Sequence, residues 1–214
     1  MFLPGADQIQ SSMPDIYDAI ITLDSATLDR TGLDRLDVPT LCVDHHKAND
    51  DHADVSVVDI SCASTTQLLT RICEQESLAL YKQSATCFLT GLYTDTGGFV
   101  HGNTDASVFQ CAAHLSSCGA DVATITQAIY HSQSFDQLQQ ISTLLSGASL
   151  YRQIGYVSIP SIQGKELKSQ IVSRINSLKE VDIAVVFAQD GDDLRISYRT
   201  RSDDIDVSDL AGYL

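Results

Sequence analysis

The residues best suited to carry chemistry lie in the segment Asp44-His45-His46, directly after a short apolar run. A neutral imidazole is a good ligand for Mn²⁺ or Zn²⁺, and a carboxylate behind it fixes which ring nitrogen carries the proton. Paired histidines also occur in ordinary solvated loops, and on this tripeptide alone the solvated loop is the better interpretation. Residues elsewhere in the chain decide between the two.

Two aspartates at other positions favour a metal site. Asp24 ends the apolar run over residues 18–23, so we expect it at the same sheet edge as the two histidines. Asp95 lies in the segment TDTGGF (residues 94–99), where adjacent glycines let the backbone approach a ligand closely. Taken singly, Asp24 could equally cap a helix, and Asp95 is more simply a polar residue at a helix end. Together, carboxylate and imidazole ligands suit Mn²⁺ or Mg²⁺ better than a thiolate site would.

The elements that must position these residues follow from the pattern of apolar side chains. Three short runs with little alternation predict strands buried on both faces, as in a parallel sheet: residues 18–23, 40–43 and 55–58. Helices are predicted from Ser64 to Ser77, from Tyr81 to Tyr93 before Gly97-Gly98, from a cap at Thr104, and over residues 121–131. Each strand ends in an acidic residue, at the edge where open α/β sheets bind ligands.

The pattern changes after residue 133. An amphipathic stretch over residues 134–150 predicts a helix that connects two lobes. Beyond it the sequence predicts a strand, a helix and an antiparallel hairpin, over residues 155–159, 165–178, and 183–189 with 194–200. The expected fold is therefore α/β: a parallel-sheet domain over residues 1–132, a connecting helix over 133–150, and a smaller α+β domain over 151–214.

Charge limits the partners. The chain has 13 basic and 28 acidic side chains, a net charge of −15. Such a field opposes a wide basic surface for long duplex nucleic acid or anionic lipid. Clustered carboxylates can still hold divalent cations, which reverse the local sign and admit an anionic substrate. A merely solubilising acidic surface accounts for most of the excess.

Location and redox state follow from what the sequence lacks. The longest apolar run, residues 183–188, is far shorter than the roughly 18 residues of a membrane helix, and residues 1–7 do not resemble a secretory signal. The six cysteines form no CxxC pair, so we expect structural thiols rather than a zinc site. These features predict a cytoplasmic protein without a membrane partner.

At this point the sequence resembles a known family. Asp24, Asp44-His45-His46 and the TDTGGF segment match motifs two, three and four of the DHH phosphoesterases in order and spacing. The branch it is most similar to is the nanoRNase/pAp phosphatase type, with a looser similarity to RecJ-like nucleases. Residues 196–199 and 204–208 also resemble the start of the DHHA1 substrate-binding domain.

The resemblance implies a two-metal phosphoesterase, usually dependent on Mn²⁺, with Mg²⁺ as an alternative. By motif position, Asp24 would bridge the two metal ions, while His45 and Asp95 would complete one of the two sites. His46 would face the scissile phosphate as a catalytic and substrate-binding residue. Asp44 would act in catalysis by orienting a histidine. Two cations a few ångströms apart activate a water and neutralise the charge that develops on the phosphate.

The resemblance also implies a substrate class. Short oligonucleotides and 3′-phosphoadenosine 5′-phosphate are the expected substrates, and a homodimer is compatible with the family. By position Arg199 would bind the nucleotide or its phosphate, and Arg201 is a weaker candidate for the same role. An exposed strand residue is nearly as good an interpretation of Arg199.

The sequence departs from the family pattern at both ends. We find neither the HxxPDGDxxGS motif before the first strand nor the Gly-Gly-Gly-His segment that should follow Ser208. The chain is therefore expected to be the central part of a family member, and these 214 residues alone to bind Mn²⁺ weakly at one site and to hydrolyse little. The alternatives are a non-catalytic remnant of the fold, a cyclic-dinucleotide phosphodiesterase and a family II-type pyrophosphatase.

Overall fold

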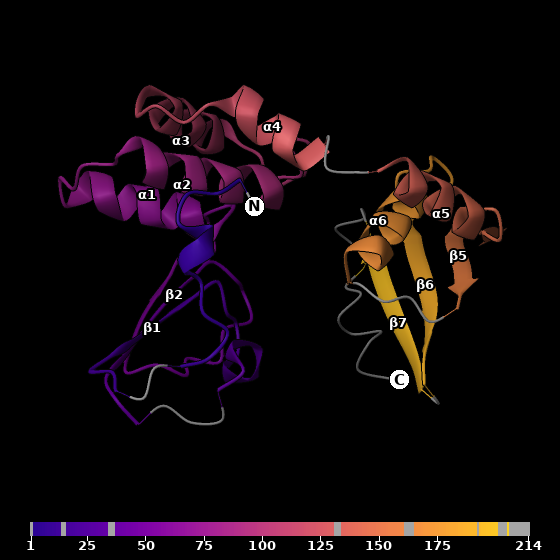
Figure 1. Cartoon of the computed structure of the whole chain (residues 1–214), viewed down its shortest axis with the longest axis horizontal. Helices are drawn as coiled ribbons and strands as arrows, with labels where there is room; N and C mark the ends of the chain where they lie inside the picture. Colours follow the sequence, from indigo (N-terminus) through magenta and orange to yellow (C-terminus); the bar gives the residue numbers. More distant parts are fainter. Residues whose placement is uncertain are drawn as a thin grey trace. The chain divides into compact units, whose positions relative to one another are not determined.

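The computed structural model describes residues 2–13, 16–33, 37–130, 134–160, 165–191, 193–200 and 205. The chain divides into two compact units, Met1–Ser132 and Gln133–Leu214, and each is described here by itself (Figure 1). Among the described residues, no helix combines the length and the apolar composition that crossing a bilayer requires. All six cysteines are free.

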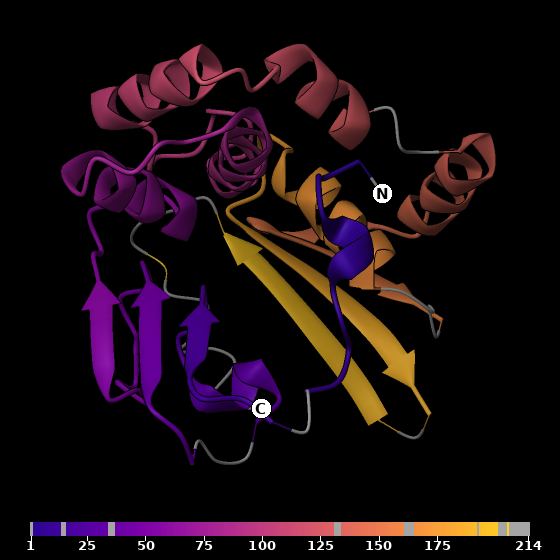
Figure 2. The ribbon, with the colours of Figure 1, turned by 60° about the vertical axis from the view of Figure 1, so that its left-hand side comes forward.

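The first unit contains the predicted parallel sheet. Its three strands lie in the order β1-β2-β3, with both neighbouring pairs parallel, and span Ile20–Leu23, Thr40–Asp44 and Val55–Val58. Because the strands are parallel, their carboxyl ends share one edge, and Figure 2 shows the three arrowheads directed toward α1. The mixed α/β class with a parallel sheet is confirmed. The predicted burial on both faces is wrong for the two outer strands, because β1 has one buried residue and β3 has none, whereas the central strand β2 is largely buried.

Helices complete the first unit, which also contains two short 3₁₀ helices, Ala6–Gln8 and Leu28–Thr31. The α-helices are α1 (Thr65–Gln75), α2 (Lys82–Asp95), α3 (Ala106–Ser117) and α4 (Val122–Tyr130). Apolar residues of α2, α3 and α4 meet in one core that includes Leu89, Leu92, Val108, Leu115 and Ile125. A smaller cluster of Val43, Cys62 and Leu68 joins α1 to β2.

The helix starts were predicted with mixed success. Ser64 caps α1 as predicted, since its side chain accepts a hydrogen bond from the amide of Gln67. The predicted cap of α3 at Thr104 is wrong by one residue. The carboxylate of Asp105 accepts from the amides of Ser107 and Val108, because an ionised carboxylate is the stronger acceptor of the two neighbouring side chains.

The second unit is a mixed sheet with helices packed on it. Its strands lie in the order β4-β5-β6-β7, and only the β5–β6 pair is parallel. They span Ser149–Tyr151, Ile154–Ile159, Ile183–Asp190 and Asp193–Thr200, and the helix α6 spans Lys165–Asn176. The β6–β7 pair is the predicted hairpin.

The helix predicted over residues 134–150 is shorter than expected. It is α5, Phe135–Leu145, and the residues beyond it turn into β4, which the sequence did not predict. Leu144 and Leu145 pack against the core of the second unit, so α5 is a part of that unit rather than a free connector. The helix ends at a turn formed by Ser146 and Gly147. The apolar residues that follow belong to the edge strand β4, and over so few residues the apolar pattern of a strand cannot be distinguished from that of a helix.

Candidate metal centre

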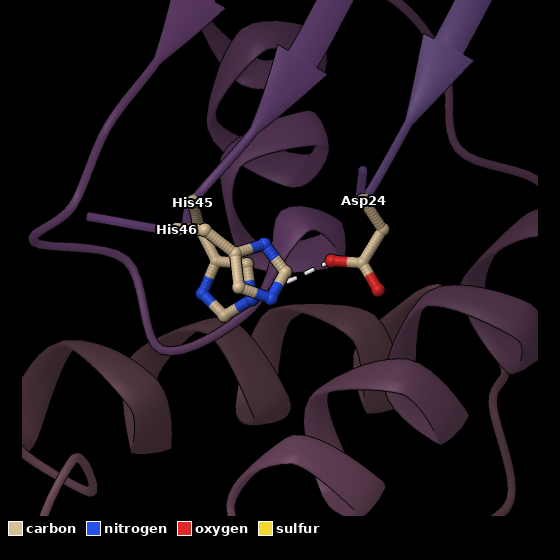
Figure 3. Close-up of side chains that lie close together, drawn as sticks. All are labelled: Asp24, His45 and His46. Atoms are coloured by element: carbon tan, nitrogen blue, oxygen red, sulfur yellow. Dashed lines mark ion pairs between the residues drawn. The ribbon is translucent and has the colours of Figure 1, made fainter. Parts of the chain in front are cut away.

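Three side chains singled out in the sequence meet at the carboxyl edge of the first sheet (Figure 3). Asp24 directly follows β1, and His45 and His46 directly follow β2. One ligand atom from each side chain lies within 4.8 Å of the other two. Within this cluster, Nε2 of His45 lies 3.4 Å from Oδ1 of Asp24. The parallel pairing of β1 with β2 brings these residues together although the chain separates them.

The ring of His45 is held in one orientation. Its Nδ1 lies 3.2 Å from the carbonyl oxygen of Cys62, which can only accept a hydrogen bond. Nδ1 therefore carries the proton, and the lone pair of Nε2 faces Asp24. A backbone carbonyl behind one imidazole nitrogen is the usual way to present the other nitrogen to a metal ion.

Asp44 supports His46 from inside the domain. Its carboxylate is fully buried and accepts hydrogen bonds from Nδ1 of His46 at 2.6 Å, from Asn49 at 2.7 Å and from the amide of His45 at 2.8 Å. Burial raises the pKa of Asp44, but these hydrogen bonds outweigh it and the net pKa is lowered. Asp44 is therefore ionised at neutral pH, and it leaves Nε2 of His46 directed away from it.

Asp24 has an unusual backbone conformation. Its φ is 58°, in the left-handed region that non-glycine residues rarely adopt, although aspartate tolerates it better than most. Its side chain is 53% exposed, and Oδ1 accepts a hydrogen bond of 2.7 Å from the hydroxyl of Thr65, the first residue of α1. Thr65 thus orients the carboxylate, a role that the sequence did not indicate.

Asp95 is the last residue of α2 and lies near the same group. Burial raises the pKa of its carboxyl, the neighbouring carboxylate of Asp24 raises it further, and His45 and His46 lower it. These charges act on Asp95 because it lies near the three residues, although its carboxylate is not in the cluster within 4.8 Å. Two carboxylates close enough to interact favour a bound cation near them.

The turn after Asp95 has a backbone conformation that requires glycine at two positions. Gly97 and Gly98 have φ values of 60° and 76°, and a Cβ at Gly97 would lie 2.3 Å from the ring of His101. Asn103 donates hydrogen bonds to the carbonyls of Ala63 and Asp95, joining this turn to the start of α1. The sequence did not mark Asn103, because its partners are backbone groups that only the folded chain brings near.

The predicted substrate arginines belong to the second unit. Arg199 is an exposed residue of β7 that donates a hydrogen bond to the hydroxyl of Ser173 on α6. It lines a groove of about 440 Å³ that also contains Lys168 and Arg195. Arg201 lies outside the described residues.

Known proteins resemble this chain over part of its length. Residues 3–92 match the DHH family, N-terminal domain. The bifunctional oligoribonuclease and PAP phosphatase NrnA of Thermus thermophilus is 32% identical over 130 residues, which cover 60% of this chain and 40% of that protein. The probable bifunctional oligoribonuclease and PAP phosphatase NrnA of Streptococcus mutans is 31% identical over 85 residues, which cover 40% of this chain and 27% of that protein. The chain thus matches less than half the length of these curated relatives.

A solved structure shares the fold. An exopolyphosphatase-related protein from Bacteroides fragilis superimposes with a TM-score of 0.75 at 23% identity, over 86% of this chain and 59% of that one. The match is too long for the first unit alone, so it extends into the second. The segment that matches the DHH family N-terminal domain, residues 3–92, contains Asp24, His45 and His46.

Proposed function

We propose that this protein hydrolyses phosphoester bonds with the help of divalent metal ions. The observation that carries the proposal is the convergence of Asp24, His45 and His46 at one sheet edge of a DHH domain. Carboxylate oxygens fit Mn²⁺, or Mg²⁺ as an alternative, together with an imidazole whose Nδ1 is bonded to a backbone carbonyl and whose Nε2 is left for the metal ion. Such cations, when bound, activate a water and neutralise the charge of a phosphate.

The first task of the protein is to hold the cations. We assign Asp24, His45 and Asp95 to this role, with Thr65 fixing the carboxylate of Asp24. The carbonyl of Cys62 keeps His45 in the tautomer that can bind. These partners are in place in the chain itself, so the site needs little rearrangement to accept a cation.

The second task is to bind the reacting phosphate, which we assign to His46. The carboxylate of Asp44 lies 2.6 Å from Nδ1 of His46 and so directs Nε2 of that ring away from Asp44. A proton on Nε2 would be donated in a hydrogen bond to a phosphate oxygen. A donor fixed in advance stabilises the negative charge that builds up there during hydrolysis.

The names of the two relatives support a substrate class. We propose short oligonucleotides and 3′-phosphoadenosine 5′-phosphate as substrates, because both relatives are named as oligoribonuclease and PAP phosphatase. The second unit is then a DHHA1-like substrate-binding domain, in which Arg199 would contact a phosphate. The six free thiols support a reducing, cytoplasmic location.

Hydrolysis of a small panel of substrates tests the proposal. The panel holds a dinucleotide, 3′-phosphoadenosine 5′-phosphate, a cyclic dinucleotide and pyrophosphate, each with Mn²⁺ and with a chelator. These 214 residues alone are expected to hydrolyse slowly. The release of mononucleotide or phosphate that they give from the first two substrates should depend on Mn²⁺ and be lowered at least about a hundredfold by Asp24→Asn. The control is Asp105→Asn. This variant preserves the N-cap of α3 and changes a carboxylate outside the cluster.

Two results would contradict the proposal. Turnover that survives both the chelator and Asp24→Asn would show that the reaction does not use the metal centre. Turnover of pyrophosphate alone, or of the cyclic dinucleotide alone, would show that the proposed substrate class is wrong.

A further inference from the structure

The backbone around Asp24 is tied to one short segment of the loop that follows β2. The residues of that segment are Asp50 and His52, and neither is part of the cluster at the metal centre. Four hydrogen bonds join these two residues to one another and to the chain on either side of Asp24. We call this set of bonds the Asp50–His52 clamp.

One side of the clamp holds the strand before Asp24. The side chain of His52 is only 4% exposed, and its Nε2 lies 3.2 Å from the hydroxyl of Thr22 in β1. Its Nδ1 lies 2.7 Å from the carboxylate of Asp50, which can only accept. Nδ1 therefore carries the proton, and Nε2 accepts a hydrogen bond from Thr22.

The other side holds the loop after Asp24. The amide of Asp50 donates to the carbonyl of Ala26 at 2.9 Å, and the carboxylate of Asp50 accepts from the amide of Leu28 at 3.3 Å. The clamp thus fixes the chain two residues before Asp24 and again two and four residues after it. Asp24 itself donates its amide to the carbonyl of Val43 at 3.1 Å.

The backbone conformation of Asp24 requires support such as the Asp50–His52 clamp gives. A non-glycine residue with φ of 58° keeps that conformation only when its surroundings hold it there. Thr65 and His45 contact the end of the Asp24 side chain, so the backbone on either side of Asp24 must fix where that side chain starts. A relaxed φ at Asp24 would swing the carboxylate away from His45.

We propose that His52 is a positioning residue for Asp24, acting through its hydrogen bonds to Thr22 and Asp50. His52 makes no contact with the reacting groups, and it is buried in a loop where a solvated histidine would be expected. This inference rests on the proposed function for its consequence, the affinity for a metal ion. The geometric part, that His52 holds the backbone of Asp24, stands without it.

The first measurement needs no metal and tests the geometry. It is the rate of hydrogen exchange at the amide of Asp24, followed by NMR in the whole chain. We expect His52→Phe, which keeps the size of the side chain and removes both hydrogen bonds, to speed this exchange about tenfold or more. Exchange at the amide of Leu115, in the helical core, should stay as in the wild type. Unchanged exchange at Asp24 would overturn the proposal.

The second measurement is the affinity for Mn²⁺ by calorimetry. Loss of a residue that orients a ligand weakens metal binding by about 10- to 100-fold, and we expect that range for His52→Phe. Thr22→Val, which removes one end of the clamp, should have a smaller effect, and the double variant should be no weaker than His52→Phe alone. His52→Asn, which keeps a donor toward Asp50, should recover part of the loss.

A matched control separates positioning from lost stability. Ile125→Val lowers the melting temperature through the helical core, away from the loop, and should leave the Mn²⁺ affinity unchanged. Faster exchange at Asp24 without weaker Mn²⁺ binding would overturn the role of His52 in the metal centre. A wild-type chain that binds no Mn²⁺ would instead contradict the proposed function, and the exchange measurement would still decide the geometry.

Discussion

Asp44 is a buried charged residue that contacts both histidines of the candidate site. The carboxylate has no exposed surface, and three hydrogen bonds offset the cost of burying it. Two of those bonds come from the amide of His45 and the ring of His46. Asp44 therefore fixes both the start of the loop and the orientation of the His46 ring. Removing its charge should therefore affect the site more than its distance from the substrate suggests.

We expect Asp44→Asn to lower Mn²⁺-dependent hydrolysis by about 10- to 100-fold, because the amide has one acceptor oxygen where the carboxylate uses two to accept from His45, His46 and Asn49. Steady-state kinetics with a dinucleotide measures the effect. A variant as active as the wild type would show that the orientation of His46 is not used in the reaction.

His46 could contact the phosphate or bind a metal ion, since one of its ring nitrogens also lies in the cluster that could hold a metal ion. If it contacts the phosphate, His46→Gln should lower the turnover number by about 10²- to 10³-fold and leave the Mn²⁺ affinity within about twofold of the wild type. Calorimetry and kinetics on the same variant separate the roles. Mn²⁺ binding weakened tenfold would make His46 a ligand instead.

At the scale of elements, the site depends on where strands and helices end. Asp24 and His45 follow parallel strands, Thr65 begins α1 and Asp95 ends α2. Such ends must be fixed, because a helix that frays by one turn moves its terminal residues. Caps such as Asp105 on α3 therefore matter to the packing of the helices behind the site.

Asp105→Ala should destabilise the first unit in a pH-dependent way. Hydrogen bonds from Ser107 and from the Val108 amide lower the pKa of Asp105, so its ionised form stabilises the fold. That stabilisation is present above the pKa of about 3.9 in the unfolded chain and is lost as the pH falls through the lower folded value. The melting temperature of the variant should thus be lower than that of the wild type at pH 7, with a smaller gap at pH 3. A gap of equal size at both pH values would contradict this account of the cap.

The sequence predicts elements well where the apolar pattern is long or the capping residue is local. The strands before Asp24 and Asp44 and the cap at Ser64 are examples, and so is the hairpin with its Asp-Gly turn. Strand β4 was missed because three residues carry too little periodicity to distinguish a strand from the end of a helix.

The candidate site was predictable where the chemistry lies in adjacent residues or directly after a predicted strand. Asp44-His45-His46 is visible in the sequence, and the strand pattern places Asp24 beside it. His52 and Thr65 could not be found in this way, because their partners lie 30 and 41 residues away along the chain. Contacts of that separation depend on how the sheet and α1 pack, which local pattern does not specify.

At the scale of the whole molecule, each unit has its own core. Apolar residues of α2, α3 and α4 form one, and residues of β5, β6 and α6 form the other. The chain therefore contains two groups of side chains that exclude water separately, and the metal centre belongs to the first unit. Damage to the second core should leave metal binding intact.

Gly155→Ala tests this division. A Cβ at Gly155 in β5 would lie 2.6 Å from Ile175 and 2.8 Å from Val181, and both are buried branched side chains with no room to move. Overpacking of this kind costs about 1–3 kcal/mol, so the second unit should melt at a lower temperature. The Mn²⁺ affinity should not change. Calorimetric scans and Mn²⁺ titrations that change together would contradict the independence of the units.

The central claim is that the edge beside β1 and β2 holds a divalent metal ion, and Mn²⁺ binding to a His45 variant tests it most directly. Calorimetry would compare the wild type, His45→Gln and His114→Gln, the last being a histidine that pairs with Glu74 away from the site. We expect the wild type and His114→Gln to bind Mn²⁺ alike, and His45→Gln to bind at least about tenfold more weakly. Equal affinity in all three proteins, or no binding in any, would contradict the account.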